Sequence, residues 1–253
     1  MNAKVFSNEV AIITGAGQGI GFEIAKQLCI NGASVLLNDV DEALAKNAAA
    51  KISQENCFAL AGDAADHSFI QLMVDEAVRR FGKLTIAIAN AGITLFGDFF
   101  EYKSEDLQSV LNLNIGGSFL LVQAAARQMK QQNSGGSILL MSSVTGHQAH
   151  KNLAAYGVTK AALEMLAKNL VVELSPFNIS INAIAPGATI TERTSEDENY
   201  IKTWSRITPM GKPATVEDIA NAALFMMSPA SRHITGQTLI IDGGWTSVSP
   251  SPY

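Results

Sequence analysis

The sequence predicts an α/β fold, a doubly wound parallel sheet of about seven strands with helices on both faces. The 253 residues are 47% apolar, which is enough to build one full hydrophobic core. Short apolar runs alternate along the chain with longer helical patterns. Several of these runs are rich in Val, Ile and Leu without alternating in polarity, which is typical of parallel strands covered on both faces. We therefore expect a single domain over residues 1–253.

The apolar runs and the helical patterns place the individual elements. Strands are expected at residues 10–13, 34–37, 57–60, 84–89, 137–141, 179–184 and 238–241. Helices are expected near residues 20–29, 42–53, 68–81, 104–130, 155–174 and 216–227. Thr215 precedes the last helix and Asp218 follows three positions later, so this helix is expected to begin with a capping box.

Residues 189–213 form the one long stretch between a predicted strand and the next clear helix. Residues 192–199 within it are strongly charged. A connection of this length in a compact domain is usually functional or mobile. We interpret it as a substrate lid that contains short helices, and the alternative is an inert surface insertion.

Composition excludes several classes of protein. A net charge of −5 argues against nucleic-acid partners and polybasic membrane surfaces. Cys29 and Cys57 lie in apolar stretches, so buried free thiols are expected. The first residues lack the apolar region of a signal peptide, and no run offers the ~20 uninterrupted apolar residues of a membrane span. These features predict a soluble cytoplasmic protein.

A glycine-rich turn, Thr14-Gly-Ala-Gly-Gln-Gly-Ile-Gly21, stands between the first predicted strand and the first predicted helix. Glycines allow a sharp turn and let a pyrophosphate approach the main-chain N–H groups at a helix N-terminus. An ordinary tight loop is the alternative, and the position between strand and helix favours dinucleotide binding. The predicted cofactor contacts here are Thr14, Gly15, Gln18, Gly19, Ile20 and Gly21.

Asp39 lies eighteen positions after Gly21, at the end of the second predicted strand. A carboxylate there can accept both hydroxyl groups of an adenosine ribose and would repel a 2′-phosphate. A turn aspartate without a ligand is the alternative. Positions 16–20 and 38–40 contain no Arg or Lys, so the sequence favours NAD(H) over NADP(H).

Tyr156 and Lys160 lie four positions apart in a helical pattern and therefore project from one face. A phenol moves protons near neutral pH when a neighbouring group favours the phenolate, and a lysine ammonium does so. Ser143 ends an apolar strand-like run thirteen positions before Tyr156, and its hydroxyl can hold a substrate oxygen. Each residue alone has an ordinary structural reading. Together they indicate general acid–base chemistry at an alcohol or carbonyl carbon.

Over essentially the whole chain, these residues resemble the classical short-chain dehydrogenase/reductase family. Its T-G-x-x-x-G-x-G pattern is met by Thr14, Gly15, Gly19 and Gly21. The other matching positions are Asn90-Ala91-Gly92, Asn114, Ser143, Tyr156, Lys160, Pro186-Gly187, Thr191, Gly236-Gln237 and Asp242-Gly243-Gly244. The resemblance implies a Rossmann-type fold and a nicotinamide cofactor.

The resemblance also implies roles for individual residues. Tyr156 would be the general acid and base, Lys160 would bind the nicotinamide ribose, and Ser143 would stabilise the substrate oxygen. Asn114 would hold a water in a proton relay to Lys160. Further implied cofactor contacts are Asp63 and Ala64 by the adenine, and Asn90, Ala91, Gly92, Pro186, Gly187 and Thr191. Thr189 stands where the family usually has Ile or Val, and its main chain would contact the carboxamide.

Substrate contacts are expected from residues 94–96, 145–153 and the lid. His147, Gln148, His150 and Asn152 make the second segment polar, which suits a sugar, polyol or hydroxy acid. The alternative is that these side chains face solvent or a subunit partner. The predicted substrate contacts are Thr94, Ser143, Gln148, Asn152 and Tyr156. No metal site is expected, because His147 has no companion ligands at metal-site spacing.

The leading hypothesis is an NAD-dependent dehydrogenase that acts on a secondary alcohol of a small polar substrate. Within the family, the alternative is a 3-oxoacyl thioester reductase, which usually draws on NADPH and therefore fits Asp39 poorly. The alternative from a different functional class is a protein of the same fold that binds a dinucleotide without catalysing a reaction. The predicted helices at 104–130 and 155–174 carry more apolar residues than one buried stripe needs, and the family resemblance implies a homotetramer through them.

Overall fold

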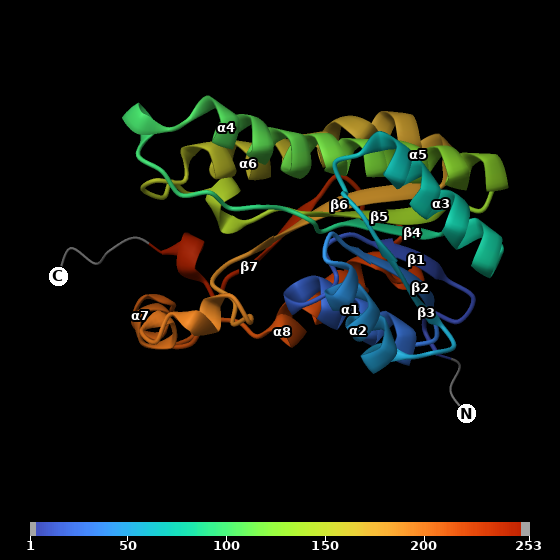
Figure 1. The fold of residues 1–253 in the computed structure, drawn as a ribbon, viewed down its shortest axis with the longest axis horizontal. Helices are drawn as coiled ribbons and strands as arrows, with labels where there is room; N and C mark the ends of the chain where they lie inside the picture. The colour runs from blue at the N-terminus through green and yellow to red at the C-terminus, as the bar shows by residue number, and fades with distance from the viewer. Residues whose placement is uncertain (1–3, 249–253) are drawn as a thin grey trace.

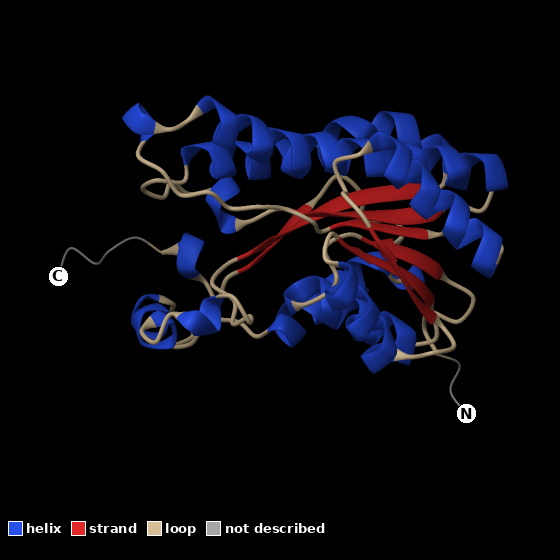
Figure 2. Cartoon of the chain, in the orientation of Figure 1, coloured by secondary structure: helices blue, strands red, loops and turns tan. Residues whose placement is uncertain are grey.

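A computed structural model describes residues 4–248 of the chain, which fold around one parallel sheet with helices on both faces (Figures 1 and 2). The seven strands lie in the order β3-β2-β1-β4-β5-β6-β7. Their bounds are β1 Val10–Ile13, β2 Ser34–Asp39, β3 Cys57–Ala61, β4 Ile86–Ala89, β5 Gly136–Met141, β6 Ile179–Pro186 and β7 Thr238–Ile241. The predicted fold class is confirmed.

The helices also follow the predicted pattern. They are α1 Gly19–Ile30, α2 Glu42–Ile52, α3 His67–Phe81, α4 Ser104–Val110, α5 Ser118–Gln132, α6 Ala154–Leu174, α7 Tyr200–Ile207 and α8 Val216–Met227. Short 3₁₀ turns include η1 Phe99–Glu101, η3 Val144–Gly146, η4 Ser175–Phe177, η5 Thr194–Glu196, η6 Pro229–Ser231 and η7 Trp245–Ser247. The predicted lid thus contains two short helices, η5 and α7.

The predicted helix at 104–130 is divided into three parts. A π-helical segment, η2 Leu111–Gly117, separates α4 from α5. The chain from Ser104 to Gln132 is long and apolar enough to cross a membrane by length and composition, but 44% of its most apolar window is buried inside the protein. Leu121 and Val122 of this stretch pack in the core beneath the sheet. It is therefore a core helix of this fold.

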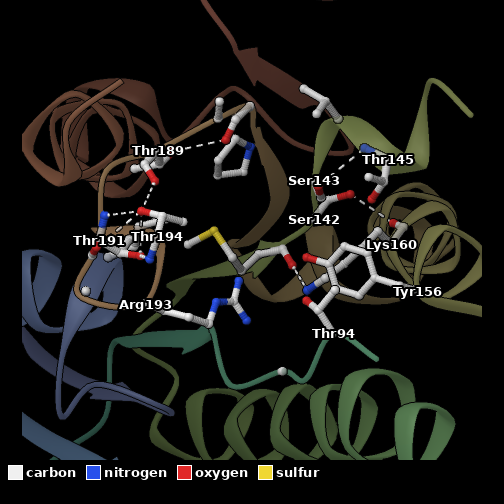
Figure 3. Close-up of a pocket in the computed structure, with 18 of the residues that line it drawn as sticks. Thr94, Ser142, Ser143, Thr145, Tyr156, Lys160, Thr189, Thr191, Arg193 and Thr194 are labelled. Carbon is white, nitrogen blue, oxygen red and sulfur yellow. Dashed lines mark hydrogen bonds between the residues drawn. The ribbon is translucent and has the colours of Figure 1, made fainter. Parts of the chain in front are cut away.

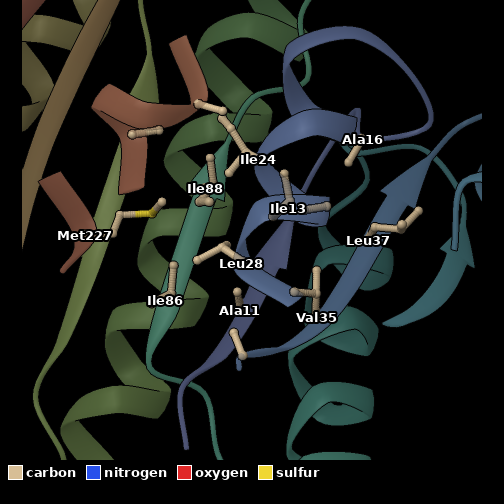
Figure 4. Packing of buried hydrophobic residues seen from close by; sticks show 14 of the residues in the cluster. Ala11, Ile13, Ala16, Ile24, Leu28, Val35, Leu37, Ile86, Ile88 and Met227 are labelled. Atoms are coloured by element: carbon tan, nitrogen blue, oxygen red, sulfur yellow. The ribbon is translucent and has the colours of Figure 1, made fainter. Parts of the chain in front are cut away.

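The core forms two layers, one on each face of the sheet. On one face, Ile24 and Leu28 of α1 pack with Ile13 of β1, Ile88 of β4 and Met227 of α8 (Figure 4). On the other face, side chains of α3, α5 and α6 cover the same strands. Cys29 and Cys57 are buried free thiols, as predicted.

The strand order reverses at β1, which pairs with β2 on one side and with β4 on the other. The connections that leave the carboxyl ends of β1 and β4 therefore turn toward opposite faces of the sheet and open a crevice between them. The loops that follow β5 and β6 begin at this same carboxyl edge of the sheet. This edge collects the predicted functional segments.

The predicted capping box at α8 is present. The Thr215 hydroxyl accepts a hydrogen bond from the Asp218 N–H, and the Asp218 carboxylate accepts one from the Thr215 N–H. We expect Thr215→Ala to lower the free energy of unfolding by about 1 kcal/mol, because it orphans an N–H in the first turn. Urea unfolding measures this change. Thr215→Ser keeps the cap and should unfold as wild type does; equal losses in both variants would contradict the capping role.

Candidate active site

A cleft of about 770 Å³ lies at the carboxyl edge of the sheet and collects many of the predicted site residues. Those on its walls are Gln18, Gly19, Ile20, Gly21, Asn90, Gly92, Thr94, Ser143, Tyr156, Lys160, Pro186, Gly187, Thr189 and Thr191. Those outside its walls are Thr14, Gly15, Asp39, Asp63, Ala64, Ala91, Asn114, Gln148 and Asn152.

The glycine-rich turn leaves the start of α1 open to the cleft. The Gln18 side chain makes no capping hydrogen bond with the helix. A Cβ on Gly21 would lie 2.5 Å from Asn90 Nδ2 and 2.6 Å from the Gly15 oxygen, so only glycine fits there. A helix N-terminus that lacks a side-chain cap and lines a cleft fits the pyrophosphate of a dinucleotide.

Thr14 and Asn90 connect this turn to the loop after β4. The Thr14 hydroxyl accepts hydrogen bonds from the N–H groups of Asn90 and Ala91, both at 3.1 Å. The Asn90 side-chain amide donates to the oxygens of Thr14 and Gly15 at 2.9 and 2.8 Å. Thr14 thus lies behind the cleft and holds its glycine-rich edge in place.

Asp39 ends β2 beside the same turn. Its carboxylate accepts from the Gly17 N–H at 3.0 Å and from the Asp41 N–H at 3.2 Å. The carboxylate is therefore held at the carboxyl edge of the sheet. Asp63 ends the β3 connection, where its carboxylate accepts from the Ala65 N–H, and neighbouring Ala64 is buried.

Ser143, Tyr156 and Lys160 meet on one side of the cleft (Figure 3). Ser143 follows β5, whereas Tyr156 and Lys160 lie on successive turns of α6. Lys160 is only 3% exposed, and its ammonium donates to the Met141 oxygen at 2.7 Å. The same Nζ lies 5.4 Å from the centre of the Tyr156 ring.

Asn114 lies in the π-helical segment and is fully buried behind these residues. Its amide exchanges hydrogen bonds with the main chain of Ile93 at 2.9 and 3.0 Å, and it donates to the Thr159 hydroxyl at 3.1 Å. A Cβ on Gly92 would lie 3.1 Å from Asn114 Oδ1 and 3.4 Å from Lys160 Nζ. Asn114 and Lys160 thus approach the same short stretch of main chain.

The segment at 145–153 differs from the expected polar wall. Among the four residues expected to form this wall, which are His147, Gln148, His150 and Asn152, only His150 lines the cleft. Gln148 and Asn152 lie outside the cleft, so their predicted substrate contacts are not supported by the structure. The Gln148 N–H closes a turn on Val144, and Asn152 adopts a left-handed φ of 65° that turns the chain. His147 instead contacts Glu164 of α6.

An aromatic series covers the substrate end of the cleft. The ring centres of His150 and Trp245 are 5.0 Å apart, those of Trp245 and Trp204 are 5.4 Å apart, and those of Trp204 and Tyr200 are 6.1 Å apart. His150 belongs to a segment predicted to contact substrate, whereas Tyr200, Trp204 and Trp245 were not among the predicted site residues. A sequence signal for part of this series is the four-residue spacing of Tyr200 and Trp204, which places both rings on one face of a helix.

The lid holds the main chain of Thr189. The Thr189 N–H donates to the Tyr200 hydroxyl at 3.0 Å, and the Thr194 hydroxyl donates to the Thr189 oxygen at the same distance. Burial raises the pKa of Tyr200, so its phenol remains protonated. Arg193 extends from the lid into the cleft, toward the side that carries Tyr156 (Figure 3).

Comparisons with known proteins agree with this geometry. A family model described as enoyl-(acyl carrier protein) reductase matches residues 15–246. A 3alpha-hydroxysteroid dehydrogenase from Mediterraneibacter gnavus is 36% identical over 249 residues, which cover 94% of this chain and 97% of that protein.

Two solved structures have the same fold. A 3-ketoacyl-(acyl-carrier-protein) reductase from Brucella melitensis, complexed with NADH, has a TM-score of 0.90 and 31% identity, covering 95% of this chain and 99% of its own. A gluconate 5-dehydrogenase from Burkholderia cenocepacia, in complex with NADP and tartrate, has a TM-score of 0.90 and 31% identity. The match covers 98% of this chain and 100% of that chain.

The chain therefore belongs to the classical short-chain dehydrogenase/reductase family, as its motifs indicate. It is an oxidoreductase of small alcohols and ketones that uses a nicotinamide dinucleotide.

The stacked His150 predicts a pH dependence of stability. Burial lowers the pKa of His150 below the ordinary histidine value. The unfolded chain therefore binds this proton more readily, and the contribution of neutral His150 to stability is lost as the pH falls below about 6.5. Between pH 7.5 and 5.5, wild type should lose more free energy of unfolding than His150→Phe, measured by urea unfolding. Equal losses in both proteins would contradict this assignment.

Proposed function

We propose that the protein transfers hydride between NAD(H) and a secondary alcohol or ketone, with Tyr156 as the general acid and base. The observation that carries this proposal is the convergence of Ser143, Tyr156 and Lys160 on a cleft whose opposite edge is the open N-terminus of α1. When bound, the nicotinamide supplies or accepts the hydride. The side chains supply position, charge and the proton path.

Each residue has a chemical role at a stated atom. In reduction, the Tyr156 hydroxyl protonates the carbonyl oxygen, and in oxidation its phenolate takes the hydroxyl proton. The Ser143 hydroxyl donates to the same substrate oxygen and stabilises developing negative charge. The Lys160 ammonium lies beside the Tyr156 ring and is placed to donate to a ribose hydroxyl. Asn114 holds the main chain beside Lys160 and the water of a proton relay.

The proposed cofactor is NAD(H) rather than NADP(H). A carboxylate at the end of β2 accepts ribose hydroxyls and repels a 2′-phosphate, and Asp39 is held there by its hydrogen bond from Gly17. The adenine lies by Asp63 and Ala64 in this proposal, and the main chain of Thr189 contacts the carboxamide. The lid bonds from Tyr200 and Thr194 must then rearrange when the cofactor binds.

The proposed substrate is a small polar molecule, such as a sugar, polyol or hydroxy acid. Thr94 lines the cleft with a hydroxyl-bearing side chain, while Trp204 and Tyr200 offer ring faces against which a carbon skeleton can pack. The structural similarity to a gluconate 5-dehydrogenase supports this class. The 3-oxoacyl thioester remains the second candidate, supported by the similarity to a 3-ketoacyl reductase.

We further propose a homo-oligomer, with a tetramer as the family resemblance implies. Large apolar side chains are exposed along the helices that the sequence analysis selected for contacts between subunits. They are Leu107 on α4, Phe119 on α5, and Val158, Met165 and Val172 on α6. A second copy would cover these side chains.

The catalytic assignment is tested with Tyr156→Phe. Wild type is screened for NADH oxidation with diacetyl and 3-oxoacyl thioesters, and for NAD⁺ reduction with sugars, polyols, hydroxy acids and hydroxyacyl thioesters. On the best substrate, Tyr156→Phe should lower kcat by about 10³-fold, because it removes the transferable proton and little volume. NADH binding, followed by fluorescence, should persist. Wild-type turnover in this variant would refute the assignment.

The cofactor assignment is tested with Asp39→Asn. The amide oxygen still accepts from Gly17, but the negative charge is gone. Wild type should favour NAD(H) over NADP(H) in kcat/KM, and Asp39→Asn should reduce this preference by about 10-fold, a differential free energy of ~1.4 kcal/mol. Wild-type kcat/KM values that favour NADP(H) would overturn the role of Asp39.

A further inference from the structure

A buried carboxylate lies behind the site and takes no part in the proposed proton path. Glu164 stands one helical turn beyond Lys160 on α6 and is 9% exposed. One carboxylate oxygen, Oε1, accepts from the Ser142 hydroxyl at 2.6 Å and lies 2.9 Å from His147 Nε2. A carboxylate leaves water only when such partners compensate it. Both partners belong to the segment that carries Ser143.

Ser142 connects three elements at the point where β5 ends. Its N–H donates to the Ile184 oxygen of β6 at 2.8 Å, and its hydroxyl lies 2.9 Å from the Lys160 oxygen on α6. Ser142 is 3% exposed and directly precedes Ser143. The Glu164 carboxylate therefore fixes the main chain one residue away from the proposed substrate-binding hydroxyl.

The turn η3 lies directly against the same carboxylate. A Cβ on Gly146 would lie 2.9 Å from Glu164 Oε1 and 3.0 Å from the Ala161 N, so the turn approaches α6 as closely as a glycine allows. His147 follows immediately and contacts the carboxylate from the other side of the turn. Glu164 is thus enclosed by Ser142, Gly146 and His147, and it does not line the cleft.

We propose that Glu164 is a positioning residue for the reaction. It locks the strand end that carries Ser143 against the helix that carries Tyr156 and Lys160, and so sets the distance between the two groups that share the substrate oxygen. This inference rests on the proposed function. Misplacement of a reacting group by about 1 Å can reduce turnover 10²-fold, so a positioning contact has kinetic consequences without touching the substrate.

The test compares Glu164→Ala, Glu164→Gln and Ser142→Ala on the best substrate of the wild-type screen. Glu164→Ala should lower kcat by about 30-fold while KM for the dinucleotide changes less than about 2-fold, because most of the proposed cofactor contacts come from the turn after β1 and the loops after β2, β4 and β6. Glu164→Gln keeps an oxygen that accepts from Ser142 and should restore kcat to within about 5-fold of wild type. Glu173→Ala, an exposed glutamate near the end of the same helix, is the matched control.

A double-variant cycle separates positioning from general destabilisation. If Ser142 and Glu164 act through one hydrogen bond, Ser142→Ala/Glu164→Ala should lose no more kcat than the worse single variant. NADH binding measured by fluorescence shows that each variant is folded. The proposal is overturned by wild-type kcat in Glu164→Ala, by single losses that multiply in the double variant, or by parallel losses of kcat and NADH affinity.

The two proposals fail separately. Wild-type turnover in Tyr156→Phe would refute the proposed chemistry whatever the Glu164 variants do. An inactive Tyr156→Phe together with a fully active Glu164→Ala would refute the positioning role alone.

Discussion

The active cleft depends on the link between the turn after β1 and the loop after β4. These two connections leave the adjacent strands β1 and β4 toward opposite faces of the sheet, so strand pairing does not hold them together beyond the strand ends. The Thr14 hydroxyl and the Asn90 amide hold the two connections together through partly buried hydrogen bonds of 2.8 to 3.1 Å. Because of this link, the glycine-rich turn and the loop after β4 are joined where both line the cleft.

The opposite side of the cleft is built by close main-chain approach. A Cβ on Gly157 of α6 would lie 2.9 Å from the Thr145 oxygen, which shows that η3 rests directly on the helix. Ser143 begins this turn, and its hydroxyl accepts from the Thr145 N–H at 3.3 Å. Its position relative to Tyr156 therefore follows from packing of a turn on a helix, and polar groups such as Ser142 hold that packing in place.

The sequence predicted the strands and the proposed catalytic residues because buried parallel strands and fixed spacings are local signals. It could not place Gln148 and Asn152, since residues 145–153 follow no helical or strand period and Asn152 turns the chain with a positive φ. Within the aromatic cover, the spacing of Tyr200 and Trp204 is a local signal, but the contact of Trp245 with Trp204 forms only after distant segments pack together. Side-chain contacts between segments far apart in the sequence leave no regular spacing that a sequence pattern could reveal.

Helix geometry explains why residues spaced four apart on α6 reach different surroundings. A four-residue step along an α-helix advances about 6 Å and rotates about 40°. Tyr156, Lys160 and Glu164 are separated by two such steps, so their side chains turn progressively away from the cleft. Tyr156 and Lys160 line the cleft, whereas Glu164 lies behind it and meets Ser142. The same periodicity that places Lys160 beside the Tyr156 ring therefore brings the Glu164 carboxylate to Ser142, the residue directly before Ser143.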